Sequence, residues 1–454
     1  MDGTTITISR ADGAALNSAR RKAYWRLLPL LFICYVVAFV DRTNVAIAKL
    51  TMTRDLPGFD NAVIGTGAGM FFIGYFLLEI PGSLIVERWS ARKWICRIML
   101  TWGLMATLTA AVTTPFQFYV VRFLLGLAEA GFFPGVIVYL THWFPRRDRA
   151  RAFAIFLIAT PIAQIISPKL SNVLLKIGTT ETVNGIAVQH PEVLGLAGWQ
   201  WIYIAWGFPA VILGIVVLFA LTDRPHQARW LGKDEAAALE RELEQEKQLL
   251  RSQGPRLGVM DALRHPKVLL LAVAAFFTVT ASYGVQFFMP SILHRWYALD
   301  FDTLTWLVIL PPVLAVVGQL VGSWSSDHFG ERRFHTVVPI AIGALAIALI
   351  PATRGNLTLT VVCFMITYFG IKAYMPAFWT LPGLFLTEAA AAGSIGLINS
   401  IANLGGFLGP FLMGKLETMT GSFVGGLYCL CASMALSVAI LFFLGIGKKP
   451  SAAG

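Results

Sequence analysis

The stretch LLLAVAAFFTVTA, Leu269–Ala281, is a continuous run of uncharged and mostly apolar residues. A strand of a membrane barrel alternates apolar with polar side chains, whereas a helix that crosses lipid is apolar over most of its surface. The run shows no such alternation. It therefore predicts a membrane-spanning helix and argues against a barrel.

The composition extends this interpretation to most of the chain. The 454 residues are 56% hydrophobic and 13% charged, whereas soluble proteins carry about 25% charged residues. Since one membrane helix needs about 20 residues, the apolar share suffices for about 12 transmembrane helices. We expect these spans near residues 27–48, 62–84, 94–113, 115–141, 152–176, 199–221, 266–293, 303–325, 336–353, 357–386, 394–418 and 422–446. The fold class is an all-α membrane protein.

An internal repeat divides the chain. Pro134 and Pro168 recur as Pro376 and Pro410 at an offset of 242 residues (376 minus 134). We predict two pseudo-symmetric six-helix bundles, residues 27–221 and 266–446. A polar linker, 222–265, joins them, and tails of 1–26 and 447–454 flank them. In transporters built from repeats, the substrate site lies between the halves near the middle of the membrane.

The basic residues follow the expected topology. The formal net charge is +11, and Lys and Arg gather in every second connection between spans, including 146–151 and the linker. This positive-inside pattern predicts cytoplasmic termini and does not indicate nucleic-acid binding. The five cysteines lie in or at the edge of apolar spans. We therefore expect no disulfide framework, metal site or cofactor.

Charged residues inside the spans carry the functional prediction. FVDRTNVAIA, Phe39–Ala48, places Asp41 and Arg42 within the first span, where each charge costs about 2.5 to 3.5 kcal/mol on insertion scales. Neighbouring residues point about 100° apart on a helix and cannot pair face to face. Arg122 and Glu129 share one face of the fourth span. We expect Asp41 to contact Arg122 and Glu129 to lie near Arg42. The two acids could bind and release protons, or the four residues could form a static ion-pair ladder between the two spans.

Cations without an obvious partner are candidates for binding an anion. Arg42 suits a carboxylate because its planar fork donates two hydrogen bonds. Lys372 lies well inside the tenth span. Lys169 could face the same cavity or the membrane interface, and Glu79 is interpreted as structural. Polar and aromatic residues that could line the cavity are Tyr75, Gln164, Tyr283, Gln286, Tyr374, Trp379, Asn399 and Asn403, and bends are expected at Pro134, Pro161, Pro290, Pro376 and Pro410.

Several motifs carry a family resemblance. SLIVERWSARK, Ser83–Lys93, resembles the loop motif G-x-L-x-D-R-x-G-R-R of the major facilitator superfamily, with Ser83, Glu87 and Ser90 as departures and Ala91 as an extra residue. The strings DRTNVAIAKL, RFLLGLAEAGFFPGVIVYLTHWFP and INSIANLGGFLGP resemble the anion:cation symporter family within it. Its bacterial tartrate, phthalate and 4-hydroxyphenylacetate permease branch is the most similar.

The resemblance implies a mechanism and assigns roles. Such proteins alternate between outward-open and inward-open states and carry organic anions with protons. Asp41 and Glu129 match the titrating acids, with Arg122 beside them, and Arg42 matches the substrate-binding arginine. Tyr75, Gln164, Trp379 and Asn399 match cavity positions, whereas Lys372 is outside the sugar-acid pattern. The cytoplasmic gate would comprise Glu87, Arg88, Arg92, Asp327, Arg332 and Arg333.

These observations predict a monomeric, proton-coupled symporter that imports a small organic carboxylate across a bacterial inner membrane. The cations Arg42 and Lys372 favour a dicarboxylate such as tartrate or phthalate. An aromatic monocarboxylate, a sugar acid, or uniport or exchange without protons remain alternatives. An enzyme is not expected, because the spans contain no nucleophile arrangement or metal-ligand cluster.

Overall fold

The computed structural model of the protein describes residues 10–183, 186–252, 264–386 and 388–446. Within these residues, 12 helical segments are long and apolar enough to cross a membrane. The predicted all-α membrane fold is therefore confirmed. The expected tail 447–454 and the start of the tail 1–26 lie outside the described residues.

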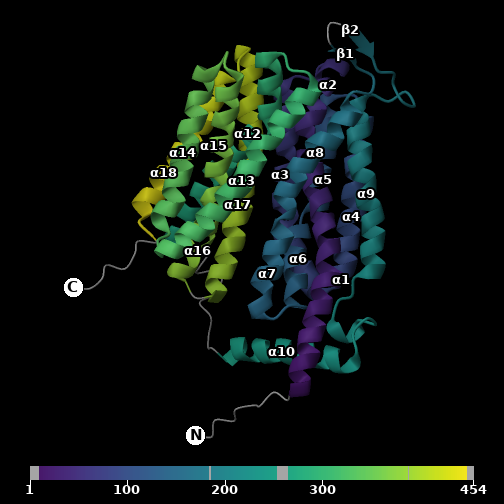
Figure 1. Ribbon diagram of the computed structural model, residues 1–454, viewed down its shortest axis with the longest axis vertical. Coiled ribbons are helices and arrows are strands. Elements are labelled where there is room, and N and C mark those ends of the chain that lie inside the picture. Colours follow the sequence, from purple (N-terminus) through teal and green to yellow (C-terminus); the bar gives the residue numbers. More distant parts are fainter. Residues whose placement is uncertain (1–9, 184–185, 253–263, 387, 447–454) are drawn as a thin grey trace, which may run out of the picture.

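The first half of the chain forms one group of helices and the second half another (Figure 1). The helices of the first group are α1 (Arg10–Thr43), α2 (Val45–Asp55), α3 (Asn61–Arg88), α4 (Ala91–Leu108), α5 (Pro115–Glu129), α6 (Phe132–Thr141), α7 (Arg146–Leu157), α8 (Ala159–Leu175) and α9 (Gly198–Ala220). Those of the second are α12 (Pro266–Tyr297), α13 (Phe301–Phe329), α14 (Arg333–Leu349), α15 (Leu357–Ala373), α16 (Met375–Thr380), α17 (Glu388–Thr420) and α18 (Val424–Leu444). Short 3₁₀ turns are η1 (Thr109–Ala111), η2 (Pro225–Gln227), η3 (Ile350–Thr353) and η4 (Leu381–Leu384).

Two elements outside the spans mark the two ends of the molecule. The helix α10 (Lys233–Ser252) lies across the end at which α1 begins, which we call the linker side (Figure 1). A small antiparallel hairpin, β1 (Thr180–Val183) with β2 (Ile186–Gln189), lies at the opposite end, the hairpin side. The helix α10 lies within the predicted polar linker, residues 222–265, whereas the hairpin was not predicted.

The linker helix α10 is bound to the first half by surface ion pairs. Lys22 Nζ lies 2.7 Å from Glu235 Oε2, and Ser18 Oγ donates to Glu235 Oε1 at 2.7 Å. Arg149 Nη2 donates to Glu246 Oε1 at 2.8 Å. The hydrogen bond from Lys22, followed by that from Ser18, lowers the pKa of Glu235 to about 2. The linker helix is therefore an attached part of the first half.

Some spans consist of two helices with a break between them. The fourth span breaks at Ala130 and Gly131, where Gly131 has a φ of 85°, and the tenth breaks at Tyr374. Each break precedes the predicted bend residue, Pro134 or Pro376, by two to four residues. The cause is that a proline cannot donate its backbone N–H and its ring clashes with the carbonyl four residues earlier.

Other proline predictions have mixed outcomes. The break between α7 and α8, at Ile158, precedes Pro161 and fits the same explanation. In contrast, α12 and α17 continue through Pro290 and Pro410, so no break forms there. The first span breaks at Asn44 between α1 and α2 without a proline, which the sequence analysis did not predict.

The two halves meet along a seam formed by α2, α3 and α8 against α12, α13 and α17. On its hairpin side, Asn61 Nδ2 donates to Glu417 Oε2 at 2.6 Å. Nearby, Asn172 Nδ2 and Lys176 Nζ donate to the two carboxylate oxygens of Asp302, at 2.7 and 2.6 Å. These contacts hold the halves together on the hairpin side.

Candidate functional site

The breaks in the first and fourth spans bring opposite charges together inside the membrane region. Arg42 lies in the last turn of α1, and Glu129 is the last residue of α5. Arg42 Nη2 donates to Glu129 Oε1 in an ion pair whose residues are 8% and 1% exposed. The prediction that Glu129 lies near Arg42 is confirmed. A cation at the end of α1 also complements the negative end of the helix dipole.

Asp41 has a different hydrogen-bond partner from the one expected. It is fully buried, and Trp102 Nε1 of α4 donates to its Oδ2 at 2.6 Å. Asp41 and Arg122 interact electrostatically, as expected, but no ion pair within 4.0 Å joins them among the described residues. The reason is geometric: with Arg42 turned toward α5, its neighbour Asp41 turns toward α4. Nothing in the sequence around Trp102 indicated this role.

Arg122 is buried beneath the ion pair. Its Nη2 lies 3.5 Å from the backbone oxygen of Arg42, one of the last carbonyls of α1, and its guanidinium carbon lies 5.3 Å from the centroid of the Phe71 ring. Its Nε and Nη1 have no hydrogen-bond partner within the described part of the chain. Arg122 is therefore an additional buried cation next to Glu129, and the helix end in the first span attracts it.

Aromatic rings of α3 lie beside Arg42. The guanidinium carbon is 5.0 Å from the centroid of the Tyr75 ring and 5.1 Å from that of Phe71. Tyr75, a predicted substrate-binding residue, thus lies next to the predicted substrate-binding arginine. Phe71 was not predicted, since an aromatic residue in an apolar span is usually part of the packing.

The second half contributes a cation of its own. Lys372 lies in the last turn of α15, next to the break at Tyr374. It is half-buried, and it forms no ion pair with any described residue. Tyr374 is buried against Phe378, with ring centroids 5.6 Å apart, and the Trp379 ring lies 5.3 Å from that of Phe378.

Asn399, a predicted cavity residue, forms a hydrogen bond that joins the two halves. Its Nδ2 donates to Glu79 Oε1 at 2.8 Å, and the neighbouring Ser400 Oγ donates to Glu79 Oε2 at 3.0 Å. Asn403 follows one turn later on α17 and is half-buried, as is Gln164 on α8. Glu79 therefore interacts with three neutral side chains of the opposite half, Asn399, Ser400 and Asn403, which fits its interpretation as structural.

Lys169 does not belong to this cluster. It is exposed on α8, and its Nζ lies 3.8 Å from the centroid of the Trp306 ring on α13. It lies on the hairpin-side part of the seam. This position does not support the alternative that Lys169 lines the same cavity as Arg42.

On the linker side, the predicted gate residues whose side chains are described form bonds within or next to their own half of the molecule. Arg332 Nη1 lies 2.7 Å from Asp327 Oδ1, and Arg333 Nη2 donates to the backbone oxygen of Phe442 at 2.5 Å. The backbone N–H of Arg92 donates to Oδ1 of Asp223, the acid that follows α9, at 2.9 Å. The side chains of Glu87 and Arg88 lie outside the described part of the structure.

Two helical bundles with buried charges at helix breaks form the architecture expected of a secondary transporter. The model of the Major Facilitator Superfamily matches residues 31–410, and the chain belongs to this family. It is accordingly a multi-pass membrane transporter and not an enzyme.

Relatives and solved structures agree with this assignment. The chain is 38% identical, over 98% of its length and 96% of the relative's, to a protein of Agrobacterium vitis named "Putative tartrate transporter". It is also 38% identical, over 93% of both chains, to "Putative metabolite transport protein NicT" of Pseudomonas putida. The fold is similar to that of the xylose transporter XylE from E. coli in an inward-open conformation, with a TM-score of 0.71 at 12% identity, covering 94% of this chain and 98% of that one.

Proposed function

We propose that the protein is a proton-coupled symporter that imports a small organic carboxylate across a bacterial inner membrane and works as a monomer. The observation that carries this proposal is the buried ion pair between Arg42 and Glu129. A carboxylate on a substrate is chemically the same group as the one that Arg42 already binds. Substrate and Glu129 therefore compete for one guanidinium.

This competition supplies a coupling mechanism. When a substrate carboxylate takes the hydrogen bonds of Arg42, the carboxylate of Glu129 loses its partner while it remains buried. Burial disfavours the charged form of a carboxyl group, so Glu129 then binds a proton. Substrate and proton are held together, and release of one weakens the hold on the other. Asp41, bonded to Trp102, is the second acid that a proton can reach.

The charge balance favours a dicarboxylate as substrate. Arg42 binds one carboxylate in this scheme, and Lys372, which has no acidic partner among the described residues, supplies a second cation. A relative named as a tartrate transporter supports this choice. The rings of Tyr75 and Phe71 beside Arg42 support an aromatic monocarboxylate as the second candidate.

We further propose that the linker side faces the cytoplasm, with both termini, as the basic connections predict. The seam is held on the hairpin side by Asn61, Glu417, Lys176 and Asp302. With the linker side inside the cell, this arrangement is closed to the outside. The moving units would be the two bundles, residues 27–221 and 266–446.

The test is uptake into proteoliposomes that contain the purified protein. Labelled tartrate, phthalate, 4-hydroxyphenylacetate and galactonate are offered with and without an inward proton gradient. We expect accumulation of one compound above its external concentration, abolished by a protonophore. Equilibration of the labelled compound at the same rate and to the same level with and without the proton gradient would contradict symport and favour uniport.

Glu129→Gln separates proton coupling from substrate binding. The amide keeps the size of the side chain and cannot release a proton. Gradient-driven accumulation should be lost, whereas exchange of labelled for unlabelled substrate should continue. Loss of both activities in a folded variant would identify the ion pair as a structural ladder.

A further inference from the structure

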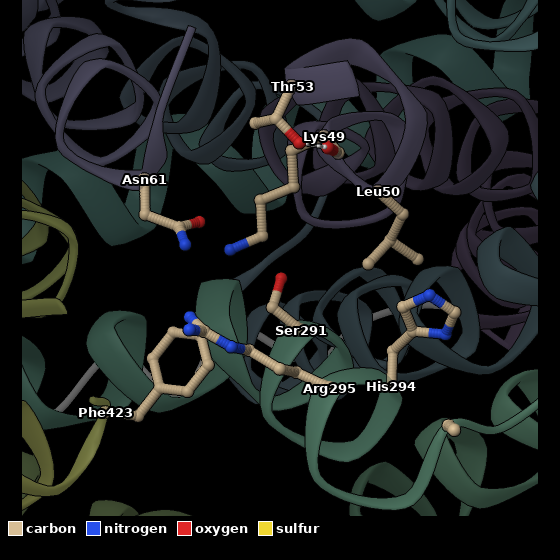
Figure 2. Close-up of a pocket in the computed structure, with 9 residues that line it drawn as sticks. Lys49, Leu50, Thr53, Asn61, Ser291, His294, Arg295 and Phe423 are labelled. Atoms are coloured by element: carbon tan, nitrogen blue, oxygen red, sulfur yellow. Dashed lines mark hydrogen bonds between the residues drawn. The ribbon is translucent and has the colours of Figure 1, made fainter. Parts of the chain in front are cut away.

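A second cationic site lies on the hairpin side, away from Arg42. A pocket of about 470 Å³ opens between α2 and α3 of the first half and α12 of the second. Its polar lining comes from Lys49, Thr53, Asn61, Ser291, His294 and Arg295 (Figure 2). The volume is in the range typical of sites for small molecules. The pocket is therefore large enough for a small organic acid.

Lys49 is a buried cation without a hydrogen-bond partner. It is 2% exposed, and its Nζ donates to no acceptor among the described residues. The ammonium lies 3.4 Å from the centroid of the Phe288 ring, and Figure 2 shows it pointing into the space between Asn61, Ser291 and Arg295. An aromatic face attracts a cation but does not accept the hydrogen bonds of its three N–H donors. The side chain is thus prepared to donate to a ligand.

The other ionisable side chains around the pocket already have hydrogen-bond partners, and none of these partners is the Lys49 ammonium. Glu417, the nearby acid, is ion-paired with Arg295 and accepts from Asn61 Nδ2 at 2.6 Å. Arg295 Nη2 also donates to the backbone oxygen of Gly421 at 3.2 Å. His294 uses its Nδ1 on the backbone oxygen of Leu299 at 2.9 Å. Glu417 is therefore bonded to Arg295 and Asn61, and Lys49 Nζ has no hydrogen-bond partner among the described residues.

We propose that this pocket is a second binding site for the carboxylate of the transported organic acid, on its route between the hairpin side and Arg42. Lys49 donates to the carboxylate, and Ser291 Oγ and Asn61 lie beside it as further polar groups. The site contains side chains from both halves of the seam, so its geometry changes when the halves move. This inference rests on the proposed function for the class of substrate.

The test counts bound ligand. Purified full-length protein in nanodiscs is titrated with labelled tartrate by equilibrium dialysis, with the uncharged diamide of tartrate as the control ligand. We expect two sites in the unaltered protein, one in Arg42→Ala, one in Lys49→Gln and none in the double variant. The control Arg54→Gln removes a cation from the same helix, where Arg54 pairs with Asp55 on the surface, and should keep two sites.

Two further measurements keep the result interpretable. Ser291→Phe fills the pocket from α12 without altering Lys49, and should also leave one site. Thermal unfolding midpoints identify any variant that does not fold. One site in the unaltered protein and none in Arg42→Ala would overturn the second site, as would binding of the diamide as strongly as tartrate. Unimpaired uptake by Arg42→Ala would instead refute the proposed function, whatever Lys49→Gln does.

Discussion

The fourth and tenth spans occupy matching places in the two halves and differ in charge. Both break just before a proline, Pro134 or Pro376, and these prolines are 242 residues apart. At the break of the fourth span, Glu129 is paired with Arg42. At the break of the tenth, Lys372 has no acidic partner among the residues that the structure describes. The repeat thus preserves the path of the backbone and not the chemistry placed on it.

This difference suggests a division of labour between the halves. In the proposed mechanism, the carboxylate of Glu129 in the first half competes with the substrate for Arg42, which is what proton coupling requires. The second half contains a cation without a competing acid, which suits recognition of a second charge on the substrate. The variants below test this division, beginning with the largest expected effect.

Removing the cation of the first half should have the largest effect. Arg42→Ala leaves Glu129 buried without its partner and removes the donor for the substrate carboxylate. Truncating one member of a buried, hydrogen-bonded charge pair costs about 2 to 5 kcal/mol, so tartrate binding at this site should weaken about 100-fold and uptake should stop. Uptake by Arg54→Ala, a surface control, should be unchanged. Normal uptake by Arg42→Ala would remove this arginine from the mechanism.

Removing the cation of the second half should discriminate between substrates. A hydrogen bond to a charged group contributes about 1.5 to 3 kcal/mol, so Lys372→Gln should raise the KM for a dicarboxylate at least about tenfold. The KM for a monocarboxylate should stay the same. Lys415→Gln, which alters an exposed lysine on α17, is the matched control. An equal loss for both substrates would contradict a role of Lys372 in selectivity.

Glu79 tests the direct connection between the halves. Glu79→Ala leaves the donors of Asn399 and Ser400 without their acceptor, at a cost of about 1 to 3 kcal/mol, and should lower the thermal unfolding midpoint and slow uptake several-fold. Glu79→Gln retains one acceptor oxygen, so its proton-driven uptake should be close to that of the unaltered protein. Loss of proton coupling in Glu79→Gln alone would show that this acid also carries protons.

The ion pair of the linker helix should have the smallest effect. Because the folded-state pKa of Glu235 is about 2, below its ordinary value of about 4.3, the contact stabilises the attached helix above pH 4 to 5. That contribution disappears as the pH falls toward about 2. Lys22→Ala should lower the stability of α10 by less than about 1 kcal/mol at pH 7, since the pair is at the surface. Amide hydrogen exchange in α10 measures this, and a difference that grows on acidification would contradict the assignment.

Local patterns in the sequence were sufficient to predict most of the fold. Apolar runs such as Leu269–Ala281 gave the spans, and Pro134 and Pro376 marked nearby breaks. The break at Asn44 had no such signal. Thr43, Asn44 and Val45 are weak helix formers, but neither proline nor glycine interrupts the helix there.

Contacts of the site were predicted where the spacing of charged residues along a helix determines them. They were missed where the packing of one helix against another determines them. The pairing of Arg42 with Glu129 followed from the need of each buried charge for a partner. The bond from Trp102 to Asp41 depends on how α4 is rotated, which no local pattern reports. Lys49 directly follows the expected span 27–48, where a lysine usually marks the membrane edge, so its burial beneath Phe288 could not be foreseen.

The hydrogen bonds of Glu79 have a mechanical consequence. Along α3, Glu79 lies about 27 Å from Asn61, at 1.5 Å per residue, and both residues bond to α17. A turn of one bundle by about 15°, the size of the subunit rotation in haemoglobin, about a fulcrum at Glu79 would move the ends at Asn61 and Glu417 apart by about 7 Å. A lever of this length converts a small angular change into an aperture wide enough for a small dicarboxylate.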